Sequence, residues 1–154
     1  MPVDYSSEKD KSMTQFDQDD YGWDTGSSAV AIVDLVLQYL KPTSVIDVGC
    51  GTGVFLEEFE KRGVDIILGV DGPATRAVFV PDDSNFVATD LTQPVELNQN
   101  FDLALCLDVA EPLPAGSAAL LVETLADLAP VLLFSAAHPA HGGQRHTHSC
   151  RPVA

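Results

Sequence analysis

The chain has 154 residues, the length of one domain with short tails, and 45% of them are hydrophobic, which is enough for a buried core. Its longest apolar stretches, residues 29–37 and 129–137, are far shorter than the ~20 residues of a membrane-spanning helix. A net charge of −15 without any basic patch argues against nucleic-acid binding, and the polar residues 1–10 are unlike a secretory signal, so we expect a soluble, cytoplasmic protein.

The first 24 residues hold seven acids and two lysines with almost no apolar periodicity, so residues 1–24 are predicted to be an acidic, flexible arm. A first helix is predicted over about residues 28–40, with Ser27 or Ser28 as its N-cap and Pro42 ending it. Its predicted inward face consists of Ile32, Val36, Tyr39 and Leu40.

From there, apolar strands alternate with helices up to residue 137. Near-continuous apolar strands separated by helices are typical of a parallel sheet that is covered on both faces. We therefore predict an α/β fold, a Rossmann-like three-layer sandwich formed by residues 25–137. The predicted strands are 45–48, 65–70, 85–88, 101–107 and 130–136, and the predicted helices are 54–62, which Gly63 caps, and 117–128.

The first strand runs directly into a glycine-rich turn, Asp47-Val-Gly-Cys-Gly-Thr-Gly53, and then into a helix. Glycines at alternating positions allow positive φ angles and let a ligand approach the backbone closely. The helix that follows directs free N–H groups and the positive end of its dipole toward the same crevice. Since open α/β sheets bind nucleotides at the carboxyl ends of their strands, the motif predicts a nucleotide site, with an ordinary strand-to-helix turn as the alternative.

The turn differs from the fingerprint of NAD-binding proteins. That fingerprint has Gly or Ala five positions after its first glycine, where this chain has Val54. It also has no acid inside the first strand, where this chain has Asp47. An NAD-binding oxidoreductase is therefore disfavoured, and the sequence offers no residues to handle a hydride.

The motif Asp-Val-Gly-Cys-Gly-Thr-Gly, with Asp71 after the next strand, resembles the class I methyltransferases that use S-adenosylmethionine (SAM). The resemblance extends from about residue 21 to residue 146. Over this range the chain is similar to a bacterial subfamily that acts on small molecules and glycans. Further segments carry it in the same order: Gly69-Val-Asp-Gly72, Thr89-Asp-Leu91, residues 101–111 and residues 133–137.

The resemblance implies that SAM, or its demethylated product S-adenosylhomocysteine (SAH), binds at the glycine turn. Asp47 would hold the methionine portion, Asp71 the two ribose hydroxyls and Asp90 the adenine amino group, because carboxylates accept hydrogen bonds from such donors. Leu91 would face the adenine ring, and the backbone near residue 107 would complete the pocket beside the sulfonium. The implied cofactor-binding residues are Asp47, Gly49, Cys50, Gly51, Gly53, Asp71, Gly72, Asp90, Leu91, Leu107 and Asp108.

These acids also have simpler interpretations. Asp71 would alternatively be a solvated loop residue, and Asp90 would only cap a turn over residues 91–94. Asp108 and Glu111 would alternatively be surface acids beside a proline-rich loop.

The chain departs from its relatives after the fourth strand. They read Glu-His-Leu-Pro, whereas this chain reads Glu111-Pro-Leu-Pro114, and Pro112 cannot act as a base as a histidine would. A sulfonium is an activated methyl donor, so transfer can proceed largely by positioning. The catalytic residues are therefore left open, with Asp108 and Glu111 as the candidates.

A second departure concerns the C-terminal region. Class I methyltransferases usually close with an antiparallel hairpin, but here only residues 138–154 follow the fifth strand, and they match the family only as far as His146. We therefore expect a mostly parallel sheet of about five strands in the order 3-2-1-4-5, without that hairpin. Its exposed edge strand invites pairing with a second copy, which predicts a homodimer.

The tail formed by residues 138–154 contains all four histidines together with Cys150. Imidazole and thiolate groups are zinc ligands, which leaves a metal site as the alternative interpretation. Their spacing fits no zinc pattern, so we predict that the tail binds no metal.

The predicted function is transfer of a methyl group from SAM to a small polar acceptor, such as a sugar or natural-product hydroxyl. The alternative is a protein that binds SAM or SAH without turnover and acts as a binding or partner module. Pro112 and the shortened C-terminal region favour this alternative. The predicted partners are a small-molecule acceptor and a second copy of the chain, with neither nucleic acid nor a membrane among them.

Overall fold

The computed structural model describes residues 25–110, 113–114 and 116–136. The predicted acidic arm, the predicted tail and the residues Glu111 and Pro112 therefore lie outside the described residues. The elements are α1 (Thr25–Tyr39), β1 (Ser44–Val48), α2 (Val54–Lys61), β2 (Ile66–Asp71), the 3₁₀ turns η2 (Pro73–Val78) and η3 (Asp83–Asn85), β3 (Phe86–Ala88), β4 (Leu103–Leu107), α3 (Ser117–Leu128) and β5 (Leu132–Ser135).

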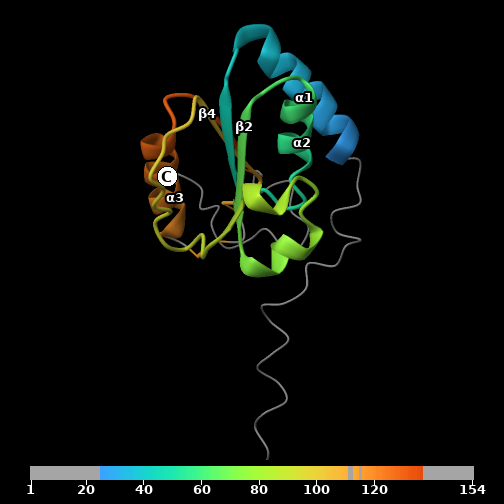
Figure 1. Ribbon diagram of the computed structural model, residues 1–154. Helices are drawn as coiled ribbons and strands as arrows, with labels where there is room; N and C mark the ends of the chain where they lie inside the picture. The colour runs from blue at the N-terminus through green and yellow to red at the C-terminus, as the bar shows by residue number, and fades with distance from the viewer. Residues whose placement is uncertain (1–24, 111–112, 115, 137–154) are drawn as a thin grey trace, which may run out of the picture.

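The strands form one five-stranded sheet in the order β3-β2-β1-β4-β5, and every neighbouring pair is parallel. Helices α1 and α2 lie on one face of the sheet, and α3 lies on the other (Figure 1). The predicted fold class and strand order are thereby confirmed. The predicted absence of a C-terminal hairpin concerns residues beyond 136 and stays a prediction.

The two faces of the sheet carry separate hydrophobic clusters, because side chains alternate along each strand. In β4, Leu103 and Leu105 belong to the cluster under α1 and α2, whereas Ala104 and Cys106 belong to the cluster under α3. All of β1 is buried, as expected for the central strand of a sheet covered on both faces. None of the helices within the described ranges is long and apolar enough to cross a membrane.

For the first helix, the predicted N-cap is wrong and the predicted inward face is correct only in part, since Val36 and Leu40 pack against the core. Helix α1 begins at Thr25, so Ser27 and Ser28 lie inside its first turn and neither is the N-cap. Tyr39 is 79% exposed instead of facing inward, whereas Ala29 and Val33 are completely buried. The reason is that apolar residues occur on all sides of this helix, so the sequence period did not distinguish the face that packs against α2.

Gly63 caps α2 as predicted. Its φ angle is +88°, and the N–H of Val64 donates to the carbonyl of Phe59 at 3.1 Å, which satisfies a free carbonyl at the helix end. The chain then enters β2, which pairs with β1 from Ile66 onward.

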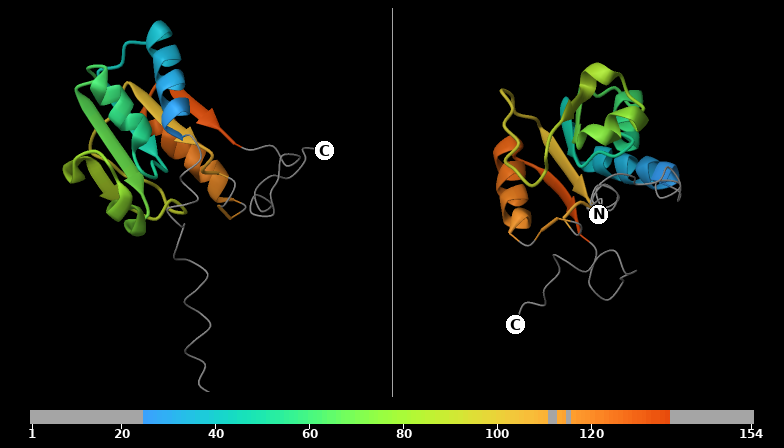
Figure 2. Two further views of the ribbon diagram at one scale, coloured as in Figure 1. Left: turned by 90° about the vertical axis from the view of Figure 1, so that its right-hand side faces the viewer. Right: turned by 90° about the horizontal axis from the view of Figure 1, so that it is seen from below.

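Strand β5 lies at the edge of the sheet beside β4 (Figure 2). Its residues carry no charge, and Leu132 and Phe134 are 38% and 42% exposed. Edge strands without charge or proline readily pair with other strands. We propose that this edge pairs with β5 of a second copy.

We expect the wild-type chain to be a dimer by light scattering, and Phe134→Lys to be a monomer because the lysine charge would be buried in the pairing. Val122→Lys is the matched control, since Val122 is 47% exposed on α3 and not on the edge strand, and this variant should remain dimeric. A monomeric wild type, or a Phe134→Lys variant that stays dimeric, would refute the pairing.

Candidate functional site

The glycine turn between β1 and α2 needs residues that tolerate a left-handed backbone. Gly49 and Gly53 have φ angles of +83° and +77°. The N–H of Gly49 donates to the carbonyl of Val70 at 2.7 Å, and the N–H of Gly53 donates to the carbonyl of Cys50 at 2.8 Å. The first bond holds the turn against the end of β2, at the carboxyl ends of the strands, and the second closes the turn on itself.

Two apolar side chains pack so closely on this turn that a Cβ atom would not fit. A Cβ on Gly49 would overlap the side chain of Val109, and a Cβ on Gly53 would lie 2.5 Å from Cε2 of Phe79. A Cβ on Gly69 in β2 would also lie 2.7 Å from the same Phe79 atom. Sequence reasoning missed both Phe79 and Val109, because they are far from the turn in the chain.

Asp71 joins β2 to the glycine turn. Its Oδ2 atom accepts a hydrogen bond from the N–H of Gly51 at 2.8 Å, and its Oδ1 atom accepts one from the N–H of Gly72 at 2.7 Å. The interpretation of Asp71 as a solvated loop acid is therefore wrong: its half-buried carboxylate is fixed at the turn, 20 residues away in sequence.

Asp47 lies in the middle of the sheet, between Gly69 of β2 and Leu105 of β4, and only 3% of it is exposed. Burial, and secondarily the negative charge of Asp71, raise the pKa of the Asp47 carboxyl from 3.8 to about 7. No hydrogen bond from the described residues reaches this carboxylate. The charged form of a buried carboxylate that accepts no hydrogen bond is stabilised by a cationic partner.

A cavity of about 150 Å³ opens at the turn. Among the predicted cofactor residues, Gly49, Cys50, Gly51 and Leu107 line it, together with Thr52, Val54 and Phe55, which sequence reasoning did not include. Burial raises the pKa of the Cys50 thiol, so this group stays protonated and neutral at the cavity wall.

The two residues that are predicted to contact adenine make no hydrogen bond to the glycine turn within the part of the chain that the structure describes. Asp90 is exposed, and its Oδ1 atom accepts hydrogen bonds from the N–H and Oγ1 of Thr92, at 2.9 and 2.7 Å, which lower its pKa. Asp90 thus caps the following turn, as its simpler interpretation expects, and Leu91 packs on the core under α3. The N–H of Thr89 donates to the carbonyl of Asp71 at 2.9 Å, so this segment begins beside the ribose candidate.

Asp108, at the end of β4, has a left-handed backbone with a φ angle of +55°. Its Oδ1 atom accepts a hydrogen bond from Oγ of Ser135 at 2.9 Å, which ties it to the end of β5. The second catalytic candidate, Glu111, lies outside the described residues. Within the described ranges, no group of three or more histidine, cysteine or acidic residues could hold a metal ion, and the histidine-rich tail lies outside them.

The sequence matches the family described as "Methyltransferase domain" over residues 27–144. Because this match covers most of the 154 residues, the chain belongs to the methyltransferase domain family, which confirms the resemblance at the level of the family. No curated protein matches the sequence significantly. The boundaries predicted for the arm, domain and tail stay predictions.

Solved structures share the fold. The chain is similar to an amino pentose methyltransferase of Micromonospora echinaspora, with a TM-score of 0.60, 22% identity, and coverage of 75% of this chain and 53% of that one. It is also similar to a sugar N-methyltransferase of Streptoalloteichus sp., with a TM-score of 0.57, 24% identity, and coverage of 75% and 49%. The chain thus spans about half the length of these proteins.

Proposed function

We propose that the chain binds SAM and transfers its methyl group to a small polar acceptor. One observation carries the proposal: the Asp71 carboxylate is fixed to the glycine turn through Gly51, at the carboxyl ends of parallel strands. Membership of the methyltransferase domain family supports the same conclusion.

The carboxylate acceptors present match the hydrogen-bond donors of SAM. Asp47 is a buried carboxylate without a hydrogen-bond partner among the described residues, and the α-ammonium group of the methionine portion would supply the missing cation. Asp71 retains unused lone pairs for ribose hydroxyls, because each carboxylate oxygen accepts more than one hydrogen bond. The remaining cofactor roles, including those of Asp90 and Leu91, stay predictions.

The size of the cavity limits how much of the cofactor it encloses. Its volume of about 150 Å³ is below the 300–1,000 Å³ of typical ligand pockets, so it fits the methionine portion and leaves the adenosine on the more open surface toward Asp71. When bound, SAM supplies a methyl group that is already activated by the sulfonium. The residues of this chain have to orient it and exclude water, since positioning supplies much of the rate in such transfers.

Calorimetric titration of the purified chain with SAH tests the proposal, with NAD as the control ligand. We expect one saturable SAH site per chain and no binding of NAD, because Val54 and Asp47 depart from the NAD fingerprint. A folded chain that ignores SAH, or that prefers NAD, would contradict the proposed function.

The acceptor is proposed to be a sugar-type small molecule. The structural neighbours described as an amino pentose methyltransferase and a sugar N-methyltransferase support this class. Turnover is measured with radiolabelled SAM and a panel of sugars and amino sugars.

A second candidate is cofactor binding without turnover, in which the chain serves as a partner module. The observation that favours it is the absence of any histidine among the first 137 residues, so the segment after β4 offers no imidazole base for a hydroxyl acceptor. SAH binding without methyl transfer to any acceptor of the panel would support this candidate, whereas turnover would exclude it.

A further inference from the structure

Asp108 follows β4 directly, between two residues that contact the glycine turn or its cavity. Its preceding neighbour, Leu107, lines the cavity, and its following neighbour, Val109, packs on Gly49. The left-handed backbone at Asp108 reverses the chain between these two contacts. Since this half of the turn is where the methionine portion is proposed to bind, Asp108 lies at the end of the site that carries the reacting methyl group.

Ser135 fixes this carboxylate from the neighbouring strand. The N–H of Asp108 donates to the carbonyl and to Oγ of Ser135, at 3.1 and 3.2 Å, while Oγ of Ser135 donates to Oδ1 at 2.9 Å. This arrangement leaves the Oδ2 atom without a hydrogen bond from the described residues. Asp108 is exposed, so a ligand can reach that atom.

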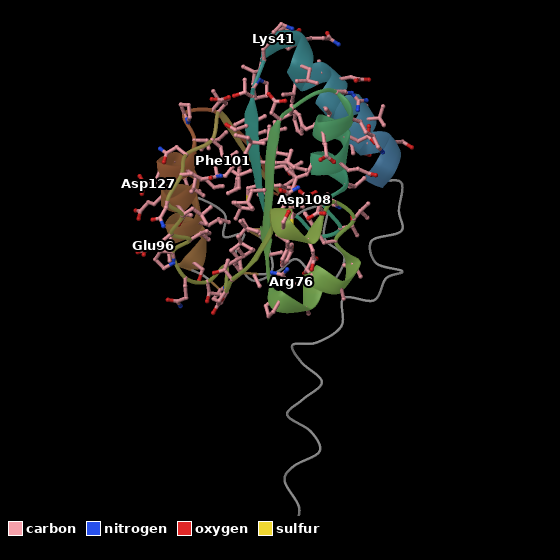
Figure 3. All side chains as sticks on the ribbon, viewed as in Figure 1. Lys41, Arg76, Glu96, Phe101, Asp108 and Asp127 are labelled. Carbon is pink, nitrogen blue, oxygen red and sulfur yellow. The ribbon has the colours of Figure 1, made fainter. Side chains whose placement is uncertain are left out.

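Among the described residues, the charges that lie next to the cavity are negative. Asp47 and Asp71 lie beneath and beside the turn, and the nearest arginines along the chain are paired elsewhere, Arg62 with Asp34 and Glu58, and Arg76 with Asp83. Lys41 lies at the opposite end of the molecule from Arg76, where the strands begin (Figure 3). An acceptor that donates hydrogen bonds or gains positive charge in the reaction is therefore favoured over an anionic one.

We propose that the Asp108 carboxylate, held in place by Ser135, receives the acceptor and that the reacting atom of the acceptor is an amine nitrogen. This inference rests on the proposed function. The lone pair of the neutral amine forms a bond to the methyl carbon, the carbon–sulfur bond breaks, and its electron pair stays on sulfur as the thioether of SAH.

The positive charge thereby moves from the sulfur to the nitrogen, which becomes a methylammonium ion. A carboxylate beside the nitrogen stabilises this developing charge. A neutral amine loses no proton during the transfer itself, whereas a hydroxyl does, and the methylammonium product releases its proton to solvent afterwards. The presence of Pro112 and the absence of histidine before residue 138 fit an amine acceptor.

The test compares two ligands that differ at the reacting centre: SAH, which is a neutral thioether there, and sinefungin, in which a protonated amine on carbon replaces the methyl-bearing sulfonium. The key variant is Asp108→Asn, which removes the charge but retains an oxygen for Ser135 and tolerates a left-handed backbone. We expect it to weaken sinefungin binding about tenfold while SAH affinity changes less than about twofold, as for one lost charge-assisted hydrogen bond.

Ser135 acts through Asp108 and is a positioning residue. Ser135→Ala should therefore also reduce the preference for sinefungin over SAH, but only by about threefold. This is the change expected from the loss of one neutral hydrogen bond. Asp127→Asn is the matched control. It removes one negative charge on α3, where Figure 3 shows Asp127 well apart from Asp108, and it should leave both affinities unchanged.

Turnover of the panel of sugars and amino sugars tests the reacting atom: the amino sugars should be methylated in preference to the sugars, and the reverse preference would overturn the amine acceptor. The affinities test the two residues. Equal losses for both ligands in Asp108→Asn, or no loss for either, would overturn the role of Asp108 while the proposed function stands. An unchanged preference in Ser135→Ala would overturn the role of Ser135. A wild-type chain that is folded but binds no SAH would refute the proposed function itself, and this inference with it.

Discussion

Replacing Asp71 by asparagine is expected to lower the affinity for SAH about 100-fold, because two hydrogen bonds from ribose hydroxyls to a charged acceptor would be weakened together. The same carboxylate holds the N–H groups of Gly51 and Gly72. A neutral amide has one acceptor oxygen and cannot serve both N–H groups and the ribose. Calorimetric titration at pH 8 measures the loss.

The matched control is Asp65→Asn. Asp65 is an exposed acid immediately before β2, at the opposite end of the strand from Asp71, and its replacement removes the same charge from the chain. We expect SAH affinity within about twofold of the wild type for this control, since exposed charges at that distance are largely screened. An Asp71→Asn variant that binds SAH like the control would place the ribose elsewhere.

Replacing Asp47 by asparagine is expected to stabilise the empty protein and to abolish cofactor binding. Burial raises the pKa of this carboxyl from 3.8 to about 7, so the folded chain holds a proton there that the unfolded chain releases. Between these two pKa values the free energy of unfolding falls as the pH rises. At about 1.4 kcal/mol per pKa unit, the penalty approaches about 4 kcal/mol above pH 7.

Urea unfolding of the wild type and of Asp47→Asn at several pH values measures this penalty. The two chains should differ little in the pH dependence of their stability below pH 4, where Asp47 is protonated in both states. The advantage of the variant should then grow up to about pH 7 and stay constant above it. A stability difference that does not change with pH would contradict the raised pKa.

Cofactor affinity should depend on the same proton. If the ammonium group of SAH pairs with the Asp47 carboxylate, binding requires the charged form, and wild-type affinity should fall about tenfold between pH 8 and pH 6. The sign is fixed, because only deprotonated Asp47 attracts the cation. Affinity that is flat over this range, or that rises as the pH falls, would exclude the ammonium from this position.

Much of the fold could be predicted because local sequence patterns determine its elements. The apolar strands, the helix Ser117–Leu128 and the cap at Gly63 all follow from hydrophobic runs and turn residues over short stretches. The buried face of helix α1 could not be predicted in this way, because its apolar residues occur on every side. Only packing against α2 selected Ala29 and Val33 as the buried face.

The sequence by itself determined the class of the protein. The glycine turn after β1 implies a nucleotide site, and this turn together with Asp71 at the end of β2 resembles the class I methyltransferases. Only the tertiary structure decided how that site is built. It placed Phe79 and Val109 against the glycines, tied Asp108 to Ser135, and buried Asp47 without a partner among the described residues. These features depend on contacts between segments far apart in the chain and on depth below the surface, and no local pattern encodes either quantity.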